Sequence, residues 1–211
     1  MIKRIIFDID DTLIPWENCY YENLGKVFEK LGVPYTNLDI TKIVEAIVEY
    51  EKEEKYFRKD AMLQKFNYKL GRTLPNNFVE VMLEYFSNCV PEQLPKETME
   101  TLSYLCDKYE LVTLTNWFEE TQKKRFQKLG LEKYFIQMYA CETIKMKPDA
   151  ESYYVAAGKQ KPDECLMVGD SIKNDVEGAM RCNMQAIYYN PKGLPTKYPN
   201  IQTLSQLKEK F

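Results

Sequence analysis

The strongest constraint on the fold is a regular alternation of two patterns through the C-terminal half of the chain. Short apolar runs rich in β-branched and aromatic residues predict strands at 110–115, 134–140, 164–168 and 185–189. The stretches between and before them repeat apolar residues every three or four positions, which predicts helices at 96–109, 119–129, 150–158 and 176–182. Alternating strands and helices favour an α/β fold, here a doubly wound, Rossmann-like core with a parallel sheet.

The N-terminal part of the chain predicts one strand followed by a helical insert. Residues 3–7 form a short apolar run that stops at Asp8, as a buried strand feeding a loop does. Between 16 and 91 only helical spacing occurs, and it predicts helices at 18–31, 39–70 and 76–89, with the charged stretch 51–59 as a solvated helix face. We therefore expect a catalytic core of residues 1–15 and 92–211, and an all-helical cap domain of residues 16–91.

The absence of one residue type and the scatter of another exclude several chemistries. The chain of 211 residues contains no histidine, which rules out Ser-His-Asp and Cys-His catalysis and imidazole metal ligands. Its six cysteines include no C-x-x-C pair, so zinc clusters and thioredoxin-type chemistry are unsupported, and reduced, packing cysteines are expected. Catalysis must use carboxylates, lysine, hydroxyls and a metal ion.

Charge and apolar runs indicate which partners and which compartment to expect. The net charge is -3 and no basic block occurs, so neither a nucleic-acid polymer nor a membrane surface is an expected partner. The N-terminus has no apolar run long enough for a signal peptide, which predicts a cytoplasmic location. The expected partner is a small molecule, bound by a monomer or a homodimer.

Two carboxylates directly follow the first predicted strand. Asp8 and Asp10 are two positions apart, so both can face one pocket at the strand end, where their like charges repel. A hard cation with oxygen ligands relieves that repulsion, and Mg²⁺ takes one or two carboxylates together with phosphate oxygens. The sequence therefore predicts a Mg²⁺ site beside Asp8.

Polar residues also follow three other predicted strands. Thr115 and Asn116 can donate hydrogen bonds to an oxyanion, and Lys147 before a proline is a positioned point charge. The stretch VGDSIKND adds Asp170 as a metal ligand, with Ser171 and Asp175 behind it. Other interpretations stay open for single residues: Asn116 and Asp175 can cap the helices that follow them, and Lys147 can be an ordinary surface lysine.

Taken in order, these features resemble the motifs of the haloacid dehalogenase-like hydrolase superfamily. FDIDDTL is similar to its D-x-D-x-T motif, LTN to its Ser/Thr motif, Lys147-Pro148 to its lysine motif and VGDSIKND to its acidic motif. The resemblance spans residues 5–175 and implies a Rossmann-like core with the first strand central, beside the strand that carries Asp170. It also implies that the helical insert is a C1-type cap. Trp117 departs from the glycine of many relatives; it either narrows the pocket or packs beside the sheet.

The resemblance implies a Mg²⁺-dependent phosphatase that works through an aspartyl-phosphate. Asp8 would be the nucleophile, Asp10 the general acid and base, and Asp8, Asp10 (through its backbone carbonyl) and Asp170 the metal ligands. Phosphate oxygens would be held by backbone N–H groups near Asp11 and Thr12 and by Thr115, Asn116 and Lys147. A dehalogenase is not expected, because dehalogenases of this superfamily lack an acid at the Asp10 position.

The expected substrate is a small phosphomonoester of the nucleotide, phosphoglycolate or sugar phosphate class. One alternative is a phosphomutase of the β-phosphoglucomutase type; others are a receiver-like signalling module and a binding protein without activity. The insert of about 75 residues argues against a receiver, which uses short connections. The cap residues that could set specificity are Trp16, Glu17, Tyr20, Tyr21, Lys55 and Arg58.

Overall fold

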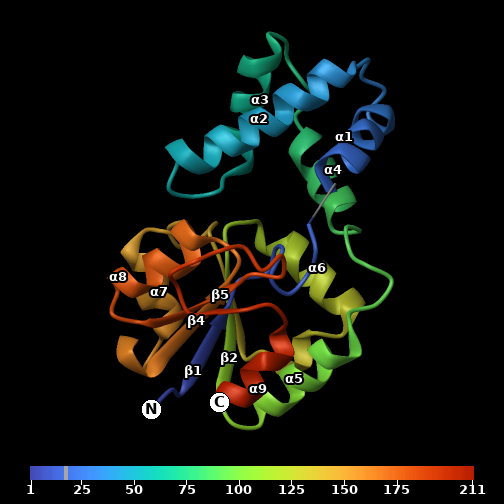
Figure 1. Cartoon of the computed structure of the whole chain (residues 1–211). Coiled ribbons are helices and arrows are strands. Elements are labelled where there is room, and N and C mark those ends of the chain that lie inside the picture. The colour runs from blue at the N-terminus through green and yellow to red at the C-terminus, as the bar shows by residue number, and fades with distance from the viewer. Residues whose placement is uncertain (17–18) are drawn as a thin grey trace.

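A six-stranded parallel sheet forms the centre of the computed structural model, which describes residues 1–16 and 19–211 (Figure 1). Its strands are β1 (Arg4–Phe7), β2 (Glu110–Thr115), β3 (Gln137–Ala140), β4 (Cys165–Gly169), β5 (Gln185–Tyr189) and β6 (Asn200–Ile201). They lie in the order β3-β2-β1-β4-β5-β6, with every pairing parallel. The predicted doubly wound core is confirmed, with β1 central and β4 beside it; the two-residue edge strand β6 was not predicted.

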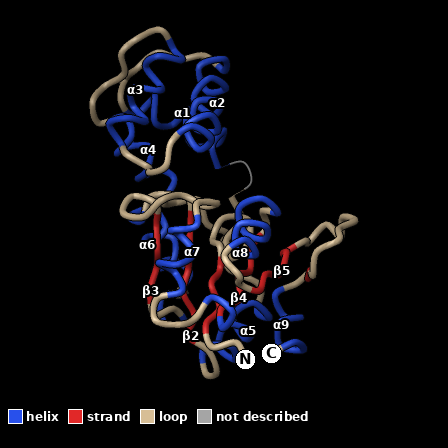
Figure 2. Tube along the Cα trace, turned by 90° about the vertical axis from the view of Figure 1, so that its left-hand side faces the viewer, coloured by secondary structure: helices blue, strands red, loops and turns tan. Residues whose placement is uncertain are grey.

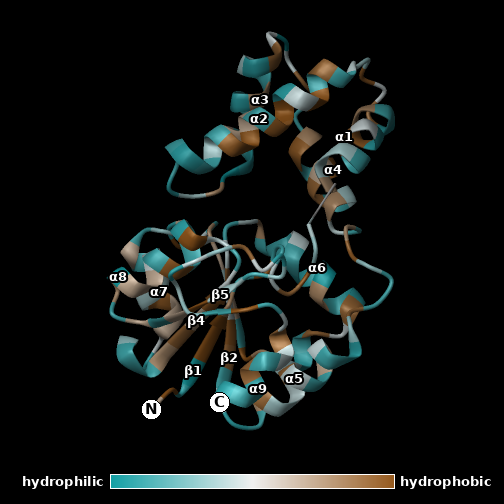
Figure 3. Ribbon diagram, viewed as in Figure 1, coloured by the Kyte–Doolittle hydropathy of each residue, from teal (hydrophilic) through white to brown (hydrophobic). Residues whose placement is uncertain are grey.

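Helices cover both faces of this sheet. They are α5 (Lys96–Cys106), α6 (Glu119–Leu129), α7 (Ala150–Ala157), α8 (Gly178–Arg181) and α9 (Leu207–Lys210). Ile5 and Phe7 point to the face that packs on α5, α6 and α9, whereas Ile6 points to the face that packs on α7 and α8. Strands buried on both faces read as apolar runs, which is why β1 after Arg4, and most of β4, are hydrophobic in Figure 3. Within the described residues, no helix has both the length and the hydropathy needed to cross a bilayer.

The helical insert lies over the carboxyl edge of the sheet, as Figures 1 and 2 show. Its helices are α1 (Cys19–Lys30), α2 (Asn37–Glu53), α3 (Lys59–Leu70) and α4 (Phe78–Phe86), and they share an apolar core of their own. They confirm the all-helical cap and fall within the predicted insert, whose boundaries at 16 and 91 stay a prediction.

The predicted single helix at 39–70 is wrong, because α2 and α3 are separate helices. The Tyr50 hydroxyl donates to Tyr56 O at 3.1 Å and accepts from Arg58 N at 3.2 Å, which stabilises a loop between them. This loop contacts the core: Phe57 N donates to Cys141 O at 2.9 Å and Met146 N donates to Lys55 O at 2.7 Å. These hydrogen bonds, and the burial of Phe57, outweigh the helix propensity of the charged stretch.

The expectation of six reduced cysteines is also wrong. Cys19 and Cys89 form a disulfide with Cα atoms 5.8 Å apart, joining the first residue of α1 to the chain just after α4. The two residues are 70 positions apart in sequence and meet only because the insert begins and ends at one place. The other four are free, and Cys141, Cys165 and Cys182 are buried packing residues as predicted.

Candidate active site

Asp8 lies at the carboxyl end of the central strand, buried under the cap. Its Oδ1 accepts a hydrogen bond from Lys147 Nζ at 2.6 Å, and its Oδ2 accepts from Thr12 Oγ1 at 3.3 Å. Asp11 adopts a left-handed conformation with φ of 58°, which aspartate tolerates better than most residues, and it turns the chain sharply after the strand. Position in the sheet thus places the predicted nucleophile beside a cation.

The backbone N–H groups in the tight turn after Asp8 have partners within the protein. Asp11 N donates to Ile14 O at 2.9 Å and Thr12 N donates to Ile9 O at 3.3 Å. The Asp11 carboxylate in turn accepts from Trp16 N at 2.8 Å, at the start of the chain leading to the cap. The N–H groups of Asp11 and Thr12 are therefore paired within the turn, and the expected contact of phosphate with N–H groups near these residues stays a prediction.

Lys147 is the central cation of the site and is itself buried. Its Nζ lies 2.6 Å from both Asp8 Oδ1 and Asp175 Oδ1. Burial alone would lower the pKa of Lys147, but Asp175 and Asp8 raise it above the ordinary value, so the ammonium stays charged. This geometry rules out the surface-lysine interpretation.

Asn116 holds Lys147 rather than capping a helix. Its Nδ2 donates to Lys147 O and its Oδ1 accepts from Lys147 N, both at 2.8 Å. The residue at the N-cap of α6 is Phe118, so the capping alternative for Asn116 is excluded. The side chain also lines the active-site cavity, and its predicted contact with phosphate stays a prediction.

Asp8, Asp170 and Asp175 form a compact acidic cluster. Each offers a carboxylate oxygen, and these oxygens all lie within 4.8 Å of one another. Asp175 was predicted behind the metal ligands, but it lies in the cluster, where its Oδ2 accepts a hydrogen bond from Ser171 N at 2.9 Å. The N-cap of the helical turn that follows is Ser171 and not Asp175. Gly169 permits this approach, because a Cβ there would lie 2.3 Å from Asp175 Cγ.

The electrostatics of the cluster fit a divalent cation. Burial raises the pKa of Asp8 well above its ordinary value, against the opposing effect of Lys147, and the neighbouring carboxylates raise it further. Burial, together with the charges of Asp175 and Asp11, raises the pKa of Asp170 to about 7. Mg²⁺ or a similar hard cation would stabilise the ionised form of these closely spaced carboxylates, because it binds their oxygens and offsets their negative charge.

These pKa shifts predict how stability depends on pH and Mg²⁺. Between the unfolded pKa of about 3.9 and the raised folded values, the folded state binds more protons, so the free energy of unfolding falls as pH rises through that window. We expect Mg²⁺ to raise Tm more at about pH 8 than at about pH 5. At 100 times Kd the gain is about 2.7 kcal/mol, or roughly 5–10 °C.

Differential scanning calorimetry with Mg²⁺ and with chelator measures this effect. Asp170→Asn should weaken the response, whereas Asp163→Asn, at an exposed aspartate away from the cluster, should retain it. An equal Mg²⁺ shift at both pH values would contradict the prediction.

Asp10 lines the active-site cavity but is not a member of this cluster, and its side chain is held by α6. Arg125 Nη1 donates to Asp10 Oδ1, and Gln122 Nε2 donates to Asp10 Oδ2 at 2.6 Å. Gln122 Nε2 also donates to Thr115 Oγ1 at 3.1 Å, which connects the predicted Thr115 to the same network. Burial raises the pKa of Asp10 above its ordinary value, although Arg125 opposes the shift.

Arg125 and Gln122 were not predicted as site residues. A signal existed: both are polar, three positions apart on α6, and so on one face of the helix, which is the buried one. The helical pattern alone gave no reason to turn that face toward Asp10.

A cavity of about 210 Å³ opens above Asp8. Its walls include Trp16, Tyr20 and Glu51 from the linker and cap and Trp117 from the core, while Thr115 does not line it. Trp117 lines the cavity and packs against Trp16, with ring centroids 5.4 Å apart, within the apolar cluster that the cap helices share.

Of the cap residues predicted to set specificity, only two line this cavity. They are Trp16 and Tyr20; Tyr21, Lys55 and Arg58 do not line it and are exposed, and Glu17 lies outside the described residues. Glu51, which does line it, was not predicted.

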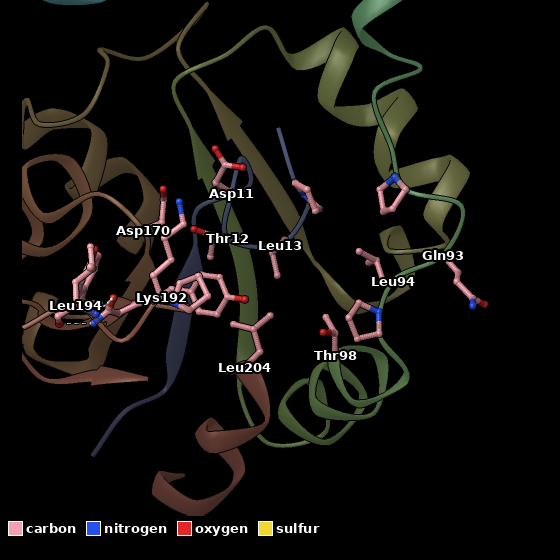
Figure 4. Close-up of a pocket in the computed structure, with 17 residues that line it drawn as sticks. Asp11, Thr12, Leu13, Gln93, Leu94, Thr98, Asp170, Lys192, Leu194 and Leu204 are labelled. Atoms are coloured by element: carbon pink, nitrogen blue, oxygen red, sulfur yellow. Dashed lines mark hydrogen bonds between the residues drawn. The ribbon is translucent and has the colours of Figure 1, made fainter. Parts of the chain in front are cut away.

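A larger cavity of about 610 Å³ lies beside the site (Figure 4). Asp11 and Asp170 border it together with the segment around Lys192 and the chain around Leu94. It contains neither Asp8 nor Asp10 nor Lys147, so the smaller cavity is the candidate active site.

The parallel sheet, the inserted cap and the acidic cluster at the strand ends together define a Rossmann-like hydrolase with a helical cap. The chain belongs to the haloacid dehalogenase-like hydrolase family, whose model matches residues 5–189.

Named relatives cover almost the whole chain at low identity. The chain is 24% identical over 229 residues to the glyceraldehyde 3-phosphate phosphatase of Methanothermobacter thermautotrophicus, covering 99% of each. It is 24% identical to the pyrimidine 5'-nucleotidase PynA of Streptococcus pneumoniae, covering 91% of this chain and 85% of that one. The structure of the HAD-hydrolase YfnB from Bacillus subtilis, bound to magnesium, matches with a TM-score of 0.78 at 21% identity, covering 99% of this chain and 98% of that one.

Proposed function

We propose that the protein is a Mg²⁺-dependent phosphohydrolase that cleaves a small phosphomonoester through an aspartyl-phosphate on Asp8. The observation that carries the proposal is Asp8 itself, buried at the end of the central strand, 2.6 Å from Lys147, with Asp10 on the same cavity. The phosphatase and nucleotidase relatives support a small phosphorylated substrate. Asp8, Asp170, Asp175 and the backbone carbonyl of Asp10 would hold Mg²⁺, which when bound offsets the charge of the cluster and the phosphate.

In the first step an Asp8 oxygen attacks phosphorus while the bond to the leaving oxygen breaks. Asp10 donates a proton to that departing oxygen, and burial shifts its pKa upward, the direction that helps a carboxyl group take up and pass on a proton. Lys147 stabilises the negative charge shared by the Asp8 carboxylate and the phosphoryl oxygens. The products are the free alcohol and phosphorylated Asp8.

In the second step Asp10 acts as a base. It accepts a proton from water as the water oxygen attacks phosphorus, and the bond between phosphorus and Asp8 breaks. Inorganic phosphate leaves, Asp8 is again a carboxylate and Asp10 is again protonated. Arg125 and Gln122 keep the Asp10 side chain in one orientation between the two steps.

Asp10→Asn should separate these steps. p-Nitrophenol is a good leaving group that needs little help from an acid, so one equivalent should be released in a burst, whereas the second step lacks its base. We expect steady turnover to fall by about 10²–10⁴-fold. Stopped-flow absorbance measures both phases, and steady turnover equal to that of the native enzyme would contradict the role of Asp10.

Phosphate release from a panel of nucleotides, sugar phosphates and phosphoglycolate tests the proposal. It should require Mg²⁺ and stop with chelator. Conversion of a sugar phosphate to its isomer without free phosphate would instead identify a mutase.

A further inference from the structure

Glu51 extends from the last turns of α2 toward the catalytic centre. It lines the same cavity as Asp8 and Lys147, although its side chain keeps contact with solvent. Burial, with a further contribution from Asp10, raises the pKa of Glu51 to about 7. The loop that follows α2 is fixed to the core by the backbone hydrogen bonds at Lys55 and Phe57, so Glu51 is held over the site.

The charges around the cavity are strongly unbalanced. Among the described residues that line it, Lys147 is the one cation, and its ammonium is already paired with Asp8 and Asp175. The carboxylates that line it are Asp8, Asp10, Asp11, Glu51, Asp170 and Asp175. Mg²⁺ and Lys147 would serve the transferring phosphate, so among the described residues that line the cavity no further cation is left to bind a second anion.

Aromatic rings also line the cavity that contains Glu51. Trp16 packs against Tyr20 and Trp117, with ring centroids 5.5 and 5.4 Å apart. The buried indole N–H of Trp117 has no hydrogen-bond partner in the described part of the chain, so an acceptor atom of a ligand would satisfy it. Aromatic faces accept planar or cationic groups well.

Resting on the phosphatase function proposed above, we propose that Glu51 is a specificity-determining residue that favours phosphomonoesters with a neutral or cationic leaving group and rejects those with a second anionic group. An anionic leaving group would face the Glu51 carboxylate across the cavity and meet repulsion. A hydrogen-bond donor or a cation would instead be bound by it. Neutral nucleoside and sugar monophosphates fit this selection, whereas bisphosphates and phosphorylated carboxylic acids do not.

Three aryl phosphates of similar shape test the charge selection: 4-(aminomethyl)phenyl phosphate, phenyl phosphate and 4-carboxyphenyl phosphate. The assay is run with Mg²⁺ at about pH 8, where Glu51 is ionised. We expect kcat/KM to fall by about 10-fold at each step from cationic to neutral to anionic leaving group. Glu51→Gln should reduce the total cationic-to-anionic ratio by about 10-fold or more. Glu45→Gln makes the same change at an exposed position of the same helix and should leave the ratio as in the native enzyme.

A second matched pair of substrates is a control for the case in which aryl phosphates bind in a different orientation from the natural substrate. Uridine and orotidine 5'-monophosphate differ only by a carboxylate on the base, and Glu51→Gln should again lower the native preference for the first. A native enzyme without charge preference, or an unchanged ratio in Glu51→Gln, would overturn the role of Glu51 while leaving the phosphatase function intact. Failure to hydrolyse any of these phosphomonoesters would overturn both.

Discussion

Replacing Asp8 with asparagine is expected to reduce kcat for p-nitrophenyl phosphate by at least about 10⁴-fold, the scale on which removal of a covalent nucleophile acts. The amide keeps the shape of the side chain but offers no anionic oxygen to attack phosphorus. The loss should appear in kcat for every substrate, because no phosphoryl group can be accepted. Intact-mass analysis of enzyme quenched during turnover should show a phosphoryl adduct on the native protein and none on the variant.

Stability distinguishes this loss from misfolding. The folded state raises the pKa of Asp8 well above its ordinary value, so the ionised carboxylate is disfavoured there. A neutral amide removes that penalty, and Lys147 keeps Asp175 as its partner. At neutral pH without Mg²⁺, Asp8→Asn should therefore be at least as stable as the native protein.

A matched control for this substitution is Asp107→Asn, at an exposed aspartate after α5. It should retain both turnover and stability. Undiminished hydrolysis by Asp8→Asn would end the proposal that Asp8 is the nucleophile.

Arg125→Met is expected to cost about 3–5 kcal/mol in the free energy of unfolding, as loss of one partner of a buried ion pair does. The guanidinium is buried and pairs with Asp10, and it also donates from Nε to Cys89 O at 2.8 Å and from Nη2 to Pro15 O at 3.1 Å. It lies 4.6 Å from the centre of the Trp16 ring. Methionine fills part of the space but leaves Asp10 Oδ1 and two carbonyl oxygens without the donor that Arg125 supplies.

Chemical denaturation at fixed pH measures this cost, and a double variant gives the sharpest check. Removing both charges in Asp10→Asn with Arg125→Met should cost less than Arg125→Met alone, because no uncompensated carboxylate stays buried. Arg125→Lys keeps a positive charge but lacks the planar guanidinium, so its free energy of unfolding should lie between those of the native protein and Arg125→Met. Lys124→Met, at the exposed neighbouring position, is the control. An additive double variant would show that Arg125 acts through packing and not through Asp10.

Arg125→Met should also lower kcat. Pro15 and Cys89 lie at the two connections between core and cap. Arg125 donates hydrogen bonds to both of their carbonyl oxygens and to Asp10, so it links the orientation of Asp10 to the position of these two connections. A variant that keeps native kcat after correction for the folded fraction would show that Asp10 needs no such support.

The sequence by itself determined the strands and helices of the core, and the placement of several site residues, where the deciding interactions are local or repetitive. The predicted residues of β2, β5 and α6 are the observed ones. Strands buried on both faces have apolar runs, and helices buried on one face repeat apolar residues every three or four positions, so both can be recognised in the sequence. Asp8, Lys147 and Asp170 were predicted together because each follows a strand, and the ends of parallel strands share one edge of the sheet.

Tertiary structure alone decided which distant segments complete the site. Arg125 meets Asp10 across 115 positions and Cys19 meets Cys89 across 70, and no local period carries such pairings. The charged stretch after Glu51 reads as helix because its propensity is helical, yet backbone hydrogen bonds to the core open it into a loop. Asp8 takes its position from a local sequence pattern. Arg125 and Gln122 take theirs from the packing of α6 on the sheet, and Glu51 takes its position from the contacts of the cap with the core.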